Sequence, residues 1–251
     1  MHMSYCGGLL CLLSALSTHA AQLDVYIDDN PPFAMQSNGT VHGLYPDVLN
    51  KLGATQGLNF RFHIQPFRQS IDSAQNSPSA CVLPIDYAPD LSETLGFVAR
   101  VISVYPTAYA RYGEIAPLKT VGDLKRYRVI SYPFDETLKD TLKTEGVRYE
   151  TPPRRSSGYD LLLAKRYDIL LADHGPGLRS KTQGHPLSVV LSLGQIDLWL
   201  ACNRGTPQDT LNRLRTILLH GFISETVAPI WDSYGAGDLY KQMRHDWGIS
   251  H

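Results

Sequence analysis

The chain has 251 residues, of which 43% are hydrophobic and 19% are charged. Its 23 Lys and Arg residues nearly balance its 24 Asp and Glu residues, so the formal net charge is −1. Such a balance gives no electrostatic attraction for nucleic acid or for an anionic membrane surface, and we expect no nucleic-acid partner. The length suits one large domain or two lobes of ordinary size.

The first 21 residues differ in character from the rest of the chain. They contain no Lys, Arg, Asp or Glu, and residues 7–16 form a short apolar core. The Thr18-His19-Ala20 pattern is typical of a signal-peptidase site, with Ala21 as an alternative end. We therefore predict a signal peptide over residues 1–21, too short to span a membrane, and an exported protein that begins near Gln22. Because the expected basic residues are missing, a buried N-terminal helix is the alternative.

Cleavage of this segment would leave two of the four cysteines, Cys81 and Cys202. An oxidising compartment permits them to form a disulfide, and two buried free thiols are an equal alternative. The sequence contains neither a CxxC nor an HExxH motif. We therefore expect no metal or other cofactor.

The first third of the chain alternates between predicted strands and helices. A stiff turn, Asn30-Pro31-Pro32-Phe33, follows the first strand, and its two prolines lower the entropy lost on ordering. The alternation predicts right-handed crossovers and a parallel sheet. The strands are expected at residues 23–27, 59–64 and 81–85, and the helices at residues 46–52 and 67–74.

The same alternation begins again after an extended apolar connector at residues 97–112. Two α/β lobes joined by two crossings explain the repetition, and a ligand would bind in the cleft between them. The boundaries expected are 22–105 for lobe 1, 106–195 for lobe 2, and 196–251 for the return to lobe 1 with C-terminal helices. The elements expected after the connector are a helix start at 120–124, strands at 128–132, 147–150, 167–171 and 196–202, and helices at 135–143, 158–164 and 210–234.

Several short motifs, taken in their order, resemble type II periplasmic solute-binding proteins of the amino-acid-binding kind, family 3 of the ABC importers. The resemblance covers nearly all of the chain after the signal peptide. It implies a two-lobed, hinged α/β fold with mixed sheets that closes on a small-molecule solute in the periplasm. It also implies a monomer whose partner is a membrane importer or a receptor. The motifs are Asn30-Pro31-Pro32-Phe33 with Gly39, Gly43 and Asp47; Ala88-Pro89-Asp90; residues 121–124 with Arg128-Val129; Lys165-Arg166-Tyr167-Asp168 before Asp173; and residues 221–223 through Tyr234.

The sequence departs from this family at positions where the resemblance places ligand contacts. Leu91 occupies the position of the arginine that grips a ligand carboxylate, and Arg68 or Arg100 would have to replace it. Asn30 stands where a stacking ring is common. Asp173 falls where the family holds an acid for the ligand ammonium, and Asp86 falls where a small hydroxyl residue is more common. We therefore predict a solute that bears an amine or a positive charge.

Four aromatic residues, Phe33, Tyr45, Phe67 and Tyr105, are candidates for a box around such a cation, although aromatic residues in α/β proteins more often belong to the core. If Arg68 points into the cleft, an anionic solute becomes the alternative.

Two other functions stay open. A dehydratase-like enzyme on the same scaffold would use Asp173 and His174 for acid–base chemistry, but such enzymes also need the missing arginine. An accessory protein with a degenerate ligand site would bind a partner protein instead, as Leu91 and Asn30 allow. We expect binding for import or sensing, and no enzyme.

Overall fold

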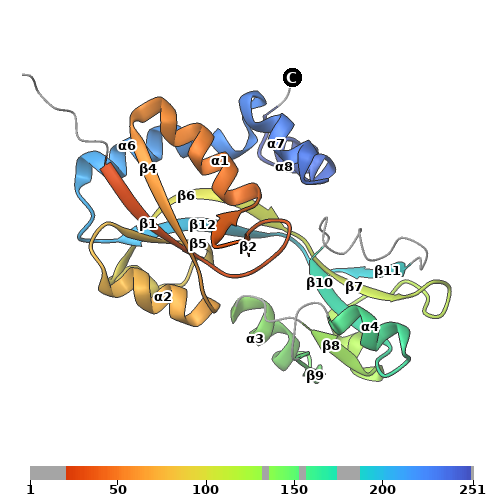
Figure 1. The fold of residues 1–251 in the computed structure, drawn as a ribbon. Coiled ribbons are helices and arrows are strands. Elements are labelled where there is room, and N and C mark those ends of the chain that lie inside the picture. The colour runs from red at the N-terminus through yellow and green to blue at the C-terminus, as the bar shows by residue number, and fades with distance from the viewer. Residues whose placement is uncertain (1–20, 132–135, 153–156, 174–186, 250–251) are drawn as a thin grey trace, which may run out of the picture.

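The computed structural model describes residues 21–131, 136–152, 157–173 and 187–249. Within these ranges the strands form two five-stranded sheets and one short hairpin, β2 (Met35–Ser37) with β3 (Thr40–His42). The two large sheets lie in separate lobes, each flanked by helices (Figure 1). This arrangement confirms the two α/β lobes with mixed sheets that the sequence predicts.

The sheet of the first lobe contains β1 (Ala21–Ile27), β4 (Leu58–Ile64), β5 (Ala80–Asp86), β6 (Leu95–Val104) and β12 (Ile196–Asn203). Its strand order is β4-β1-β5-β12-β6. Strands β4 and β5 run parallel to β1, whereas β12 runs antiparallel to β5 and to β6. Leu23, Val25 and Ile27 of β1 are completely buried, as expected for a strand that turns alternate residues towards a core.

Helices cover both faces of this sheet. The larger core lies beneath α1 (Leu44–Gly53), α6 (Gln208–Leu218), α7 (Ala228–Ser233) and α8 (Gly237–Asp246). Helix α2 (Phe67–Asn76) covers the opposite face, where Ala74 packs against Val82 and Ile85 of β5 (Figure 1). Short 3-10 turns connect these elements: η1 (Ala54–Gln56), η2 (Leu91–Glu93), η4 (Gly221–Ile223) and η5 (Glu225–Val227).

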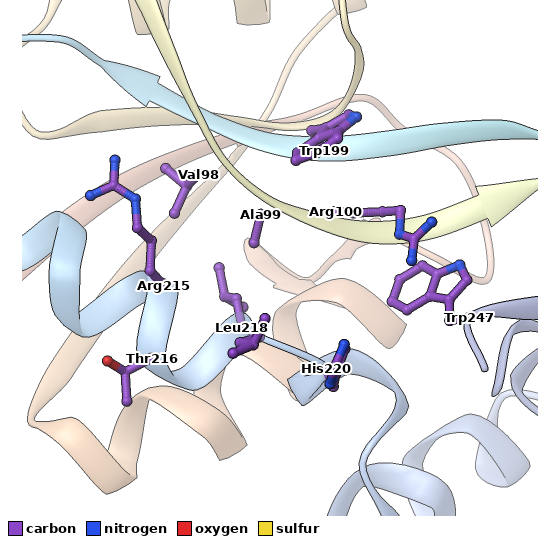
Figure 2. Close-up of a pocket in the computed structure, with 10 residues that line it drawn as sticks. Val98, Ala99, Arg100, Trp199, Arg215, Thr216, Leu218, His220 and Trp247 are labelled. Atoms are coloured by element: carbon purple, nitrogen blue, oxygen red, sulfur yellow. The ribbon is translucent and has the colours of Figure 1, made fainter. Parts of the chain in front are cut away.

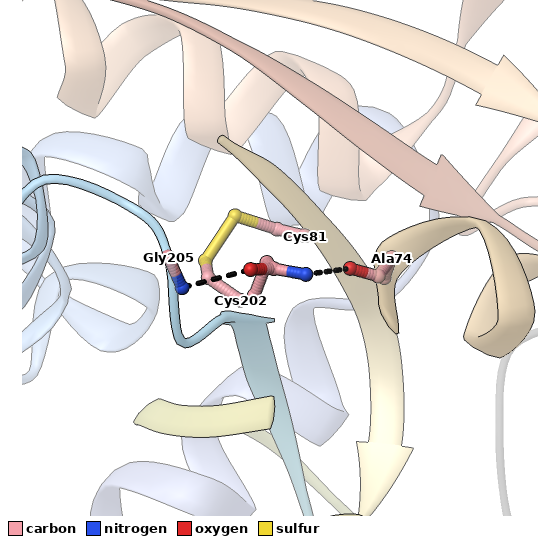
Figure 3. Close-up of a disulfide and its surroundings, with 5 residues drawn as sticks. Ala74, Cys81, Cys202 and Gly205 are labelled. Carbon is pink, nitrogen blue, oxygen red and sulfur yellow. Dashed lines mark hydrogen bonds between the residues drawn. A yellow bond between two sulfur atoms is a disulfide. The ribbon is translucent and has the colours of Figure 1, made fainter. Parts of the chain in front are cut away.

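A disulfide joins two neighbouring strands of the first sheet. Cys81 of β5 and Cys202 of β12 are partners in the antiparallel register, and their Sγ atoms are 2.08 Å apart (Figure 3). The next residue, Asn203, donates from Nδ2 to the carbonyl of Ala74 at 3.0 Å and accepts from the backbone N–H of Gly205 at 2.8 Å. The end of β12 is therefore attached covalently to β5 and by hydrogen bonds to α2.

The elements of the second lobe are β7 (Pro106–Arg111), η3 (Val121–Arg126), β8 (Val129–Ser131), α3 (Glu136–Thr144), β9 (Tyr149–Glu150), α4 (Ser157–Leu163), β10 (Ile169–Asp173) and β11 (Leu187–Ser192). The strand order of its sheet is β11-β7-β10-β8-β9. Leu138 and Leu142 of α3 pack against one face, and Tyr159 and Leu162 of α4 pack against the other. Strand β8 runs parallel to β9 and β10, whereas β7 runs antiparallel to β10 and β11.

The two crossings between the lobes run side by side. Strand β6 ends at Val104 and β7 begins at Pro106, while β11 ends at Ser192 and β12 begins at Ile196. Ile196 and Val104 are register partners, so the two connections are adjacent. Both are short enough to act as a hinge, because a few residues at the ends of elements can absorb a domain rotation.

The C-terminal segment differs from the expected helix over residues 210–234. Helix α6 ends at Leu218, and His220 adopts a left-handed conformation with φ 59°. Gly221 then packs so closely that a Cβ atom there would lie 2.9 Å from Cδ1 of Leu52. Helical periodicity therefore continues through residues that the chain uses for a tight turn. Helix α8 lies beyond the bounds expected for a helix, although within the segment in which C-terminal helices are expected.

Candidate functional site

The two sheets present the ends of parallel strands on either side of the crossings. Asp86, the last residue of β5, pairs with Leu198, which lies two residues after the start of β12. Asp173, the last residue of β10, pairs with Pro106, the first residue of β7. Open α/β sheets bind ligands outside the carboxyl ends of their strands. These two edges, which we call the interlobe edges, are therefore the candidate site.

The turn after β1 belongs to the interlobe edge of the first lobe. Asn30 and Ala34 exchange backbone hydrogen bonds, from Asn30 N–H at 2.9 Å and from Ala34 N–H at 3.1 Å. The start of α1 holds the turn in place, because Tyr45 N–H donates to the carbonyl of Phe33 at 2.9 Å. Gly43 has φ 133°, and a Cβ atom there would lie 2.6 Å from the same carbonyl. Only glycine fits this close approach of the turn to α1.

Two candidates for the aromatic box, Phe33 and Tyr45, stack on one another. Tyr45 is 2% exposed, and it packs between Phe33 at 5.3 Å and Phe222 at 6.3 Å between ring centroids. Its ring is therefore part of the core in this structure. Phe33 is half-buried and stacks on Tyr45 rather than standing free.

Tyr105 lies at the first crossing, where its hydroxyl donates to Oδ2 of Asp246 at 2.5 Å. Burial, followed by the hydrogen bond to Asp246, raises the pKa of Tyr105. This bond connects the crossing with the end of α8 and gives the hydroxyl a structural partner.

Leu91 and Arg100 both have structural roles. Leu91 is half-buried against the hydrophobic cluster beneath α2. Arg100 donates from Nη1 to Oδ2 of Asp197 at 2.8 Å, and its guanidinium carbon lies 3.8 Å from the centroid of the Trp247 ring. Arg100 lies within the edge strand β6 and not at the interlobe edges, where a substitute for the missing arginine would have to lie.

Phe67 and Arg68 begin α2, directly after the end of β4. Because β4 and β5 both run parallel to β1, this position shares the interlobe edge with Asp86. Phe67 is 41% exposed. Arg68 is also exposed, and it forms no hydrogen bond or ion pair in the part of the chain that the structure describes. Arg68 is therefore the cation that the first lobe leaves available here.

Tyr87 is an exposed residue of this edge that the sequence reading missed. It follows Asp86 directly, is 59% exposed, and leans on Phe97 with 4.9 Å between ring centroids. The signal that could have found it is its position, two residues after the strand expected at residues 81–85. The other acid of the edge, Asp173, is half-buried at the end of β10, and His174 lies outside the described residues.

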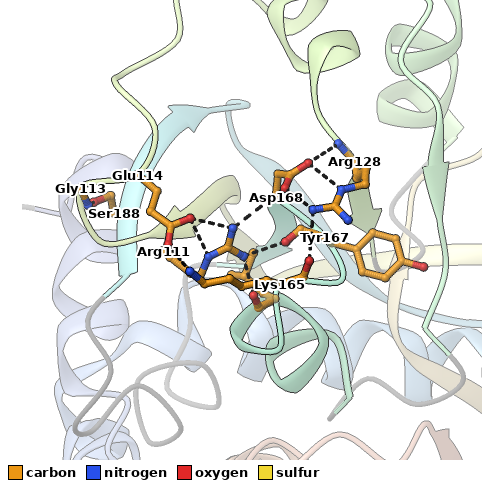
Figure 4. A network of polar contacts seen from close by, with 9 residues as sticks. Arg111, Gly113, Glu114, Arg128, Lys165, Tyr167, Asp168 and Ser188 are labelled. Atoms are coloured by element: carbon orange, nitrogen blue, oxygen red, sulfur yellow. Dashed lines mark hydrogen bonds and ion pairs between the residues drawn. The ribbon is translucent and has the colours of Figure 1, made fainter.

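A polar network in the second lobe holds the strand that carries Asp173. Arg128 donates from Nε to Oδ2 of Asp168 at 3.0 Å and from Nη2 to Oδ1 at 2.7 Å (Figure 4). The hydrogen bond from Arg128 lowers the pKa of Asp168 despite the opposing effect of burial. Arg111 donates to the carbonyls of Leu162 and Tyr167 at 2.5 and 2.7 Å. The motif around Asp168 therefore has a structural role, joining β8 to the start of β10.

Within the described residues, no group of three or more His, Cys, Asp or Glu side chains could hold a metal ion. None of the helices that the structure describes is long and apolar enough to cross a membrane.

No family model matches the sequence, and no curated protein matches it. Solved structures share its fold. An ancestral arginine-binding protein bound to arginine has a TM-score of 0.69 at 17% identity, over 86% of this chain and 99% of that chain. An ancestral amino-acid-binding protein, a precursor of cyclohexadienyl dehydratase, has a TM-score of 0.68 at 17% identity, over 85% and 95%. A histidine kinase sensor domain with similarity to periplasmic binding proteins has a TM-score of 0.67 at 18% identity, over 91% and 96%.

The chain therefore has the two-lobed fold of type II periplasmic binding proteins. The mixed sheet of each lobe and the two crossings are the features that the resemblance implied.

Proposed function

We propose that this protein is an exported, periplasmic solute-binding protein whose lobes close on a small molecule, for delivery to a membrane importer or a receptor. The observation that carries the proposal is the pair of interlobe edges beside two adjacent crossings. Neighbours in fold bound to arginine and to glutamine support a solute of that size. The similarity in fold to a histidine kinase sensor domain supports sensing as an alternative to import. The signal peptide over residues 1–21, the lobe boundaries at 105/106 and 195/196, and a monomeric state are parts of this proposal.

The solute of this proposal bears an amine or a positive charge. Leu91 supplies no charge, and Arg100 lies within edge strand β6, outside the interlobe edges. Asp86 and Asp173 end strands on opposite sides of the crossings, so closure brings a carboxylate from each lobe towards the solute. A ligand ammonium would stabilise such carboxylates when closure excludes water.

The test is a thermal-shift screen of the chain from Gln22 against amino acids, polyamines, quaternary amines, sugars and organic acids. A ligand that binds only the folded state raises the melting temperature as its concentration exceeds its dissociation constant. We expect a shift with amines, and expect Asp173→Asn to abolish it. Asp160→Asn, which changes an exposed carboxylate on α4 of the same lobe, should leave the shift intact. A shift with sugars alone would contradict the proposed solute class.

The variant Arg68→Gln distinguishes a cationic solute from the alternative, an anionic solute. The Arg68 side chain has no partner among the described residues, so removing its charge should leave folding unaffected. If the solute is a cation, binding should stay equal or become tighter. Loss of binding in Arg68→Gln, with Asp173→Asn unaffected, would assign an anionic solute instead.

Catalysis on the same scaffold is the second candidate, because one neighbour in fold is a precursor of a dehydratase. The two functions differ in the fate of the solute. We expect mass spectrometry to recover the bound solute unchanged after prolonged incubation with the protein. Conversion to a new product that requires Asp173 would assign an enzyme.

A further inference from the structure

A pocket of about 550 Å³ lies at the free edge of the first sheet, outside the interlobe edges (Figure 2). It is formed by edge strand β6, the last turn of α6 and Trp247, which follows α8. Val98, Ala99 and Leu218 give it an apolar base. Its volume falls within the range of roughly 300–1,000 Å³ that small-molecule sites occupy.

Arg100 is fixed at one wall of this pocket. Its Nη1 donates to Asp197 at 2.8 Å, and its guanidinium lies over the Trp247 ring (Figure 2). Trp247 is fixed in turn, because its Nε1–H donates to Oγ of Ser103 at 2.9 Å. The Arg100 side chain stays 31% exposed, and its Nε and Nη2 groups donate to no residue that the structure describes. The Nε and Nη2 donors of Arg100 are therefore held in a fixed orientation and have no acceptor among the described residues.

The charge of the pocket favours an anion. Arg215 and His220 line it together with Arg100, and none of the described residues that line it is acidic. Asp197 lies behind Arg100 and is held by further hydrogen bonds from Ser103 at 2.6 Å and Gln195 at 2.8 Å. Burial acts to raise the pKa of Asp197, but these hydrogen bonds together with Arg100 lower it. The Asp197 carboxylate therefore stays ionised and keeps Arg100 in place at neutral pH.

We propose that this pocket is a second binding site, which takes a small organic anion with a flat apolar body, an aromatic carboxylate. The carboxylate accepts from the unused donors of Arg100, whose planar fork matches two oxygens. The ring lies against Ala99, Leu218 and Trp247, where apolar contact and ring packing stabilise it. This site is separate from the interlobe edges and does not depend on the proposed solute.

The test uses benzoate as the probe and benzamide as its neutral counterpart. The chain has three tryptophans, and the indole N–H signal of Trp247 in a nitrogen-15 NMR spectrum is assigned with Trp247→Phe. We expect benzoate to shift that signal saturably and benzamide to leave it in place. Trp231 is completely buried and donates to the carbonyl of Phe222 at 2.7 Å, so its signal serves as the internal control. Equal shifts with both probes, or no saturable shift, would overturn the proposal.

Two variants test the site from different directions. Arg100→Gln should weaken benzoate binding by at least about tenfold, the factor that 1.4 kcal/mol represents. Ala99→Leu keeps every charge and fills the pocket, so it should also weaken binding, and it keeps the test decisive if Arg100→Gln fails to fold. Arg204→Gln, at an exposed arginine of the same lobe, is the matched control and should bind as the wild type does. Unchanged binding in Ala99→Leu, or loss of binding in Asp173→Asn, would place benzoate elsewhere and overturn the proposal.

Discussion

The hydroxyl of Tyr234 donates to Oδ2 of Asp47 at 2.6 Å and joins the segment after α7 to helix α1. Burial, and then the bond to Asp47, raise the pKa of Tyr234 to about 12. A phenolate would lie directly against a carboxylate here, and like charges disfavour the ionised form. The acidic residue of the first helix, which the sequence motifs include, therefore has a structural partner.

This pair predicts a loss of stability at alkaline pH. Because the pKa of Tyr234 is raised on folding, its contribution is complete below pH 10 and is lost as the pH rises through about 12. Tyr234→Phe should lower the free energy of unfolding at neutral pH by about 1–2 kcal/mol. It should also show a smaller decline between pH 10 and 12. Urea denaturation at several pH values measures both effects, and identical pH profiles for the two proteins would contradict the assignment.

Removing the hydroxyl of Tyr105 tests whether this side chain has a structural role or binds the solute. Tyr105→Phe removes the hydrogen bond to Asp246 and should cost about 1 kcal/mol of stability. Solute affinity should stay within about a factor of two, because the hydroxyl is already occupied by Asp246. Denaturation and calorimetric titration measure the two quantities. A tenfold loss of solute affinity with unchanged stability would instead assign Tyr105 a contact with the solute, as predicted for the aromatic box.

At the scale of elements, the turn after β1 and the start of α1 form one unit. Gly43→Ala would place a Cβ atom 2.6 Å from the carbonyl of Phe33, at a residue with φ 133°. We expect a loss of roughly 1–3 kcal/mol or more, because both the backbone strain and the clash must be relieved. Gly39→Ala is the matched control, since Gly39 also has positive φ but a Cβ atom there meets nothing within 4 Å. In thermal unfolding, the melting temperature of Gly43→Ala should be clearly lower than that of Gly39→Ala. Equal losses of stability in the two variants would show that the close approach at Gly43 does not matter.

The disulfide between β5 and β12 connects residues that are 121 positions apart in the sequence. Replacing both Cys81 and Cys202 by Ala should lower the free energy of unfolding by about 2–4 kcal/mol, because the unfolded chain regains conformational freedom. Urea denaturation of the wild type in reductant should show a similar loss. If neither the variant nor the reductant changes the transition, the two thiols would be unpaired in solution.

At the scale of the whole molecule, the arrangement of the lobes predicts a change of shape on binding. Solute held between the interlobe edges should bring the lobes together by rotation about the two crossings. Small-angle X-ray scattering should then record a smaller radius of gyration at saturating solute, and the Asp173→Asn variant should show no change. A constant radius of gyration with bound solute would place the solute within one lobe.

The sequence predicted the repeating features of the fold well, because they depend on neighbouring residues. Alternating apolar residues in β1, the strand–helix order of both lobes and the extended connector all follow from local periodicity. The helix expected over residues 210–234 failed where one left-handed residue, His220, turns the chain without disturbing the apolar pattern. The sequence order of loose motifs also led to the correct fold, although each motif alone is weak.

The sequence identifies only some of the residues that lie at the interlobe edges. The family resemblance places Asp86 and Asp173 among the ligand contacts, and in the structure both residues end strands at the interlobe edges. Tyr45 is a candidate for the aromatic box by residue type alone, but the direction of its ring depends on packing against Phe222, which lies far along the chain. A helical position fixes where a side chain begins, whereas the partner elements decide what it touches.

By itself, then, the amino-acid sequence determined the alternation of strands and helices, the two α/β lobes and the absence of a charge that would attract nucleic acid. Only the tertiary structure decided that Arg100 binds Asp197 and lies over Trp247, and that Tyr105 meets Asp246 from 141 residues away. The physical reason is that periodicity and turn chemistry act between neighbouring residues, whereas these contacts exist only after the crossings and the C-terminal helix have packed together.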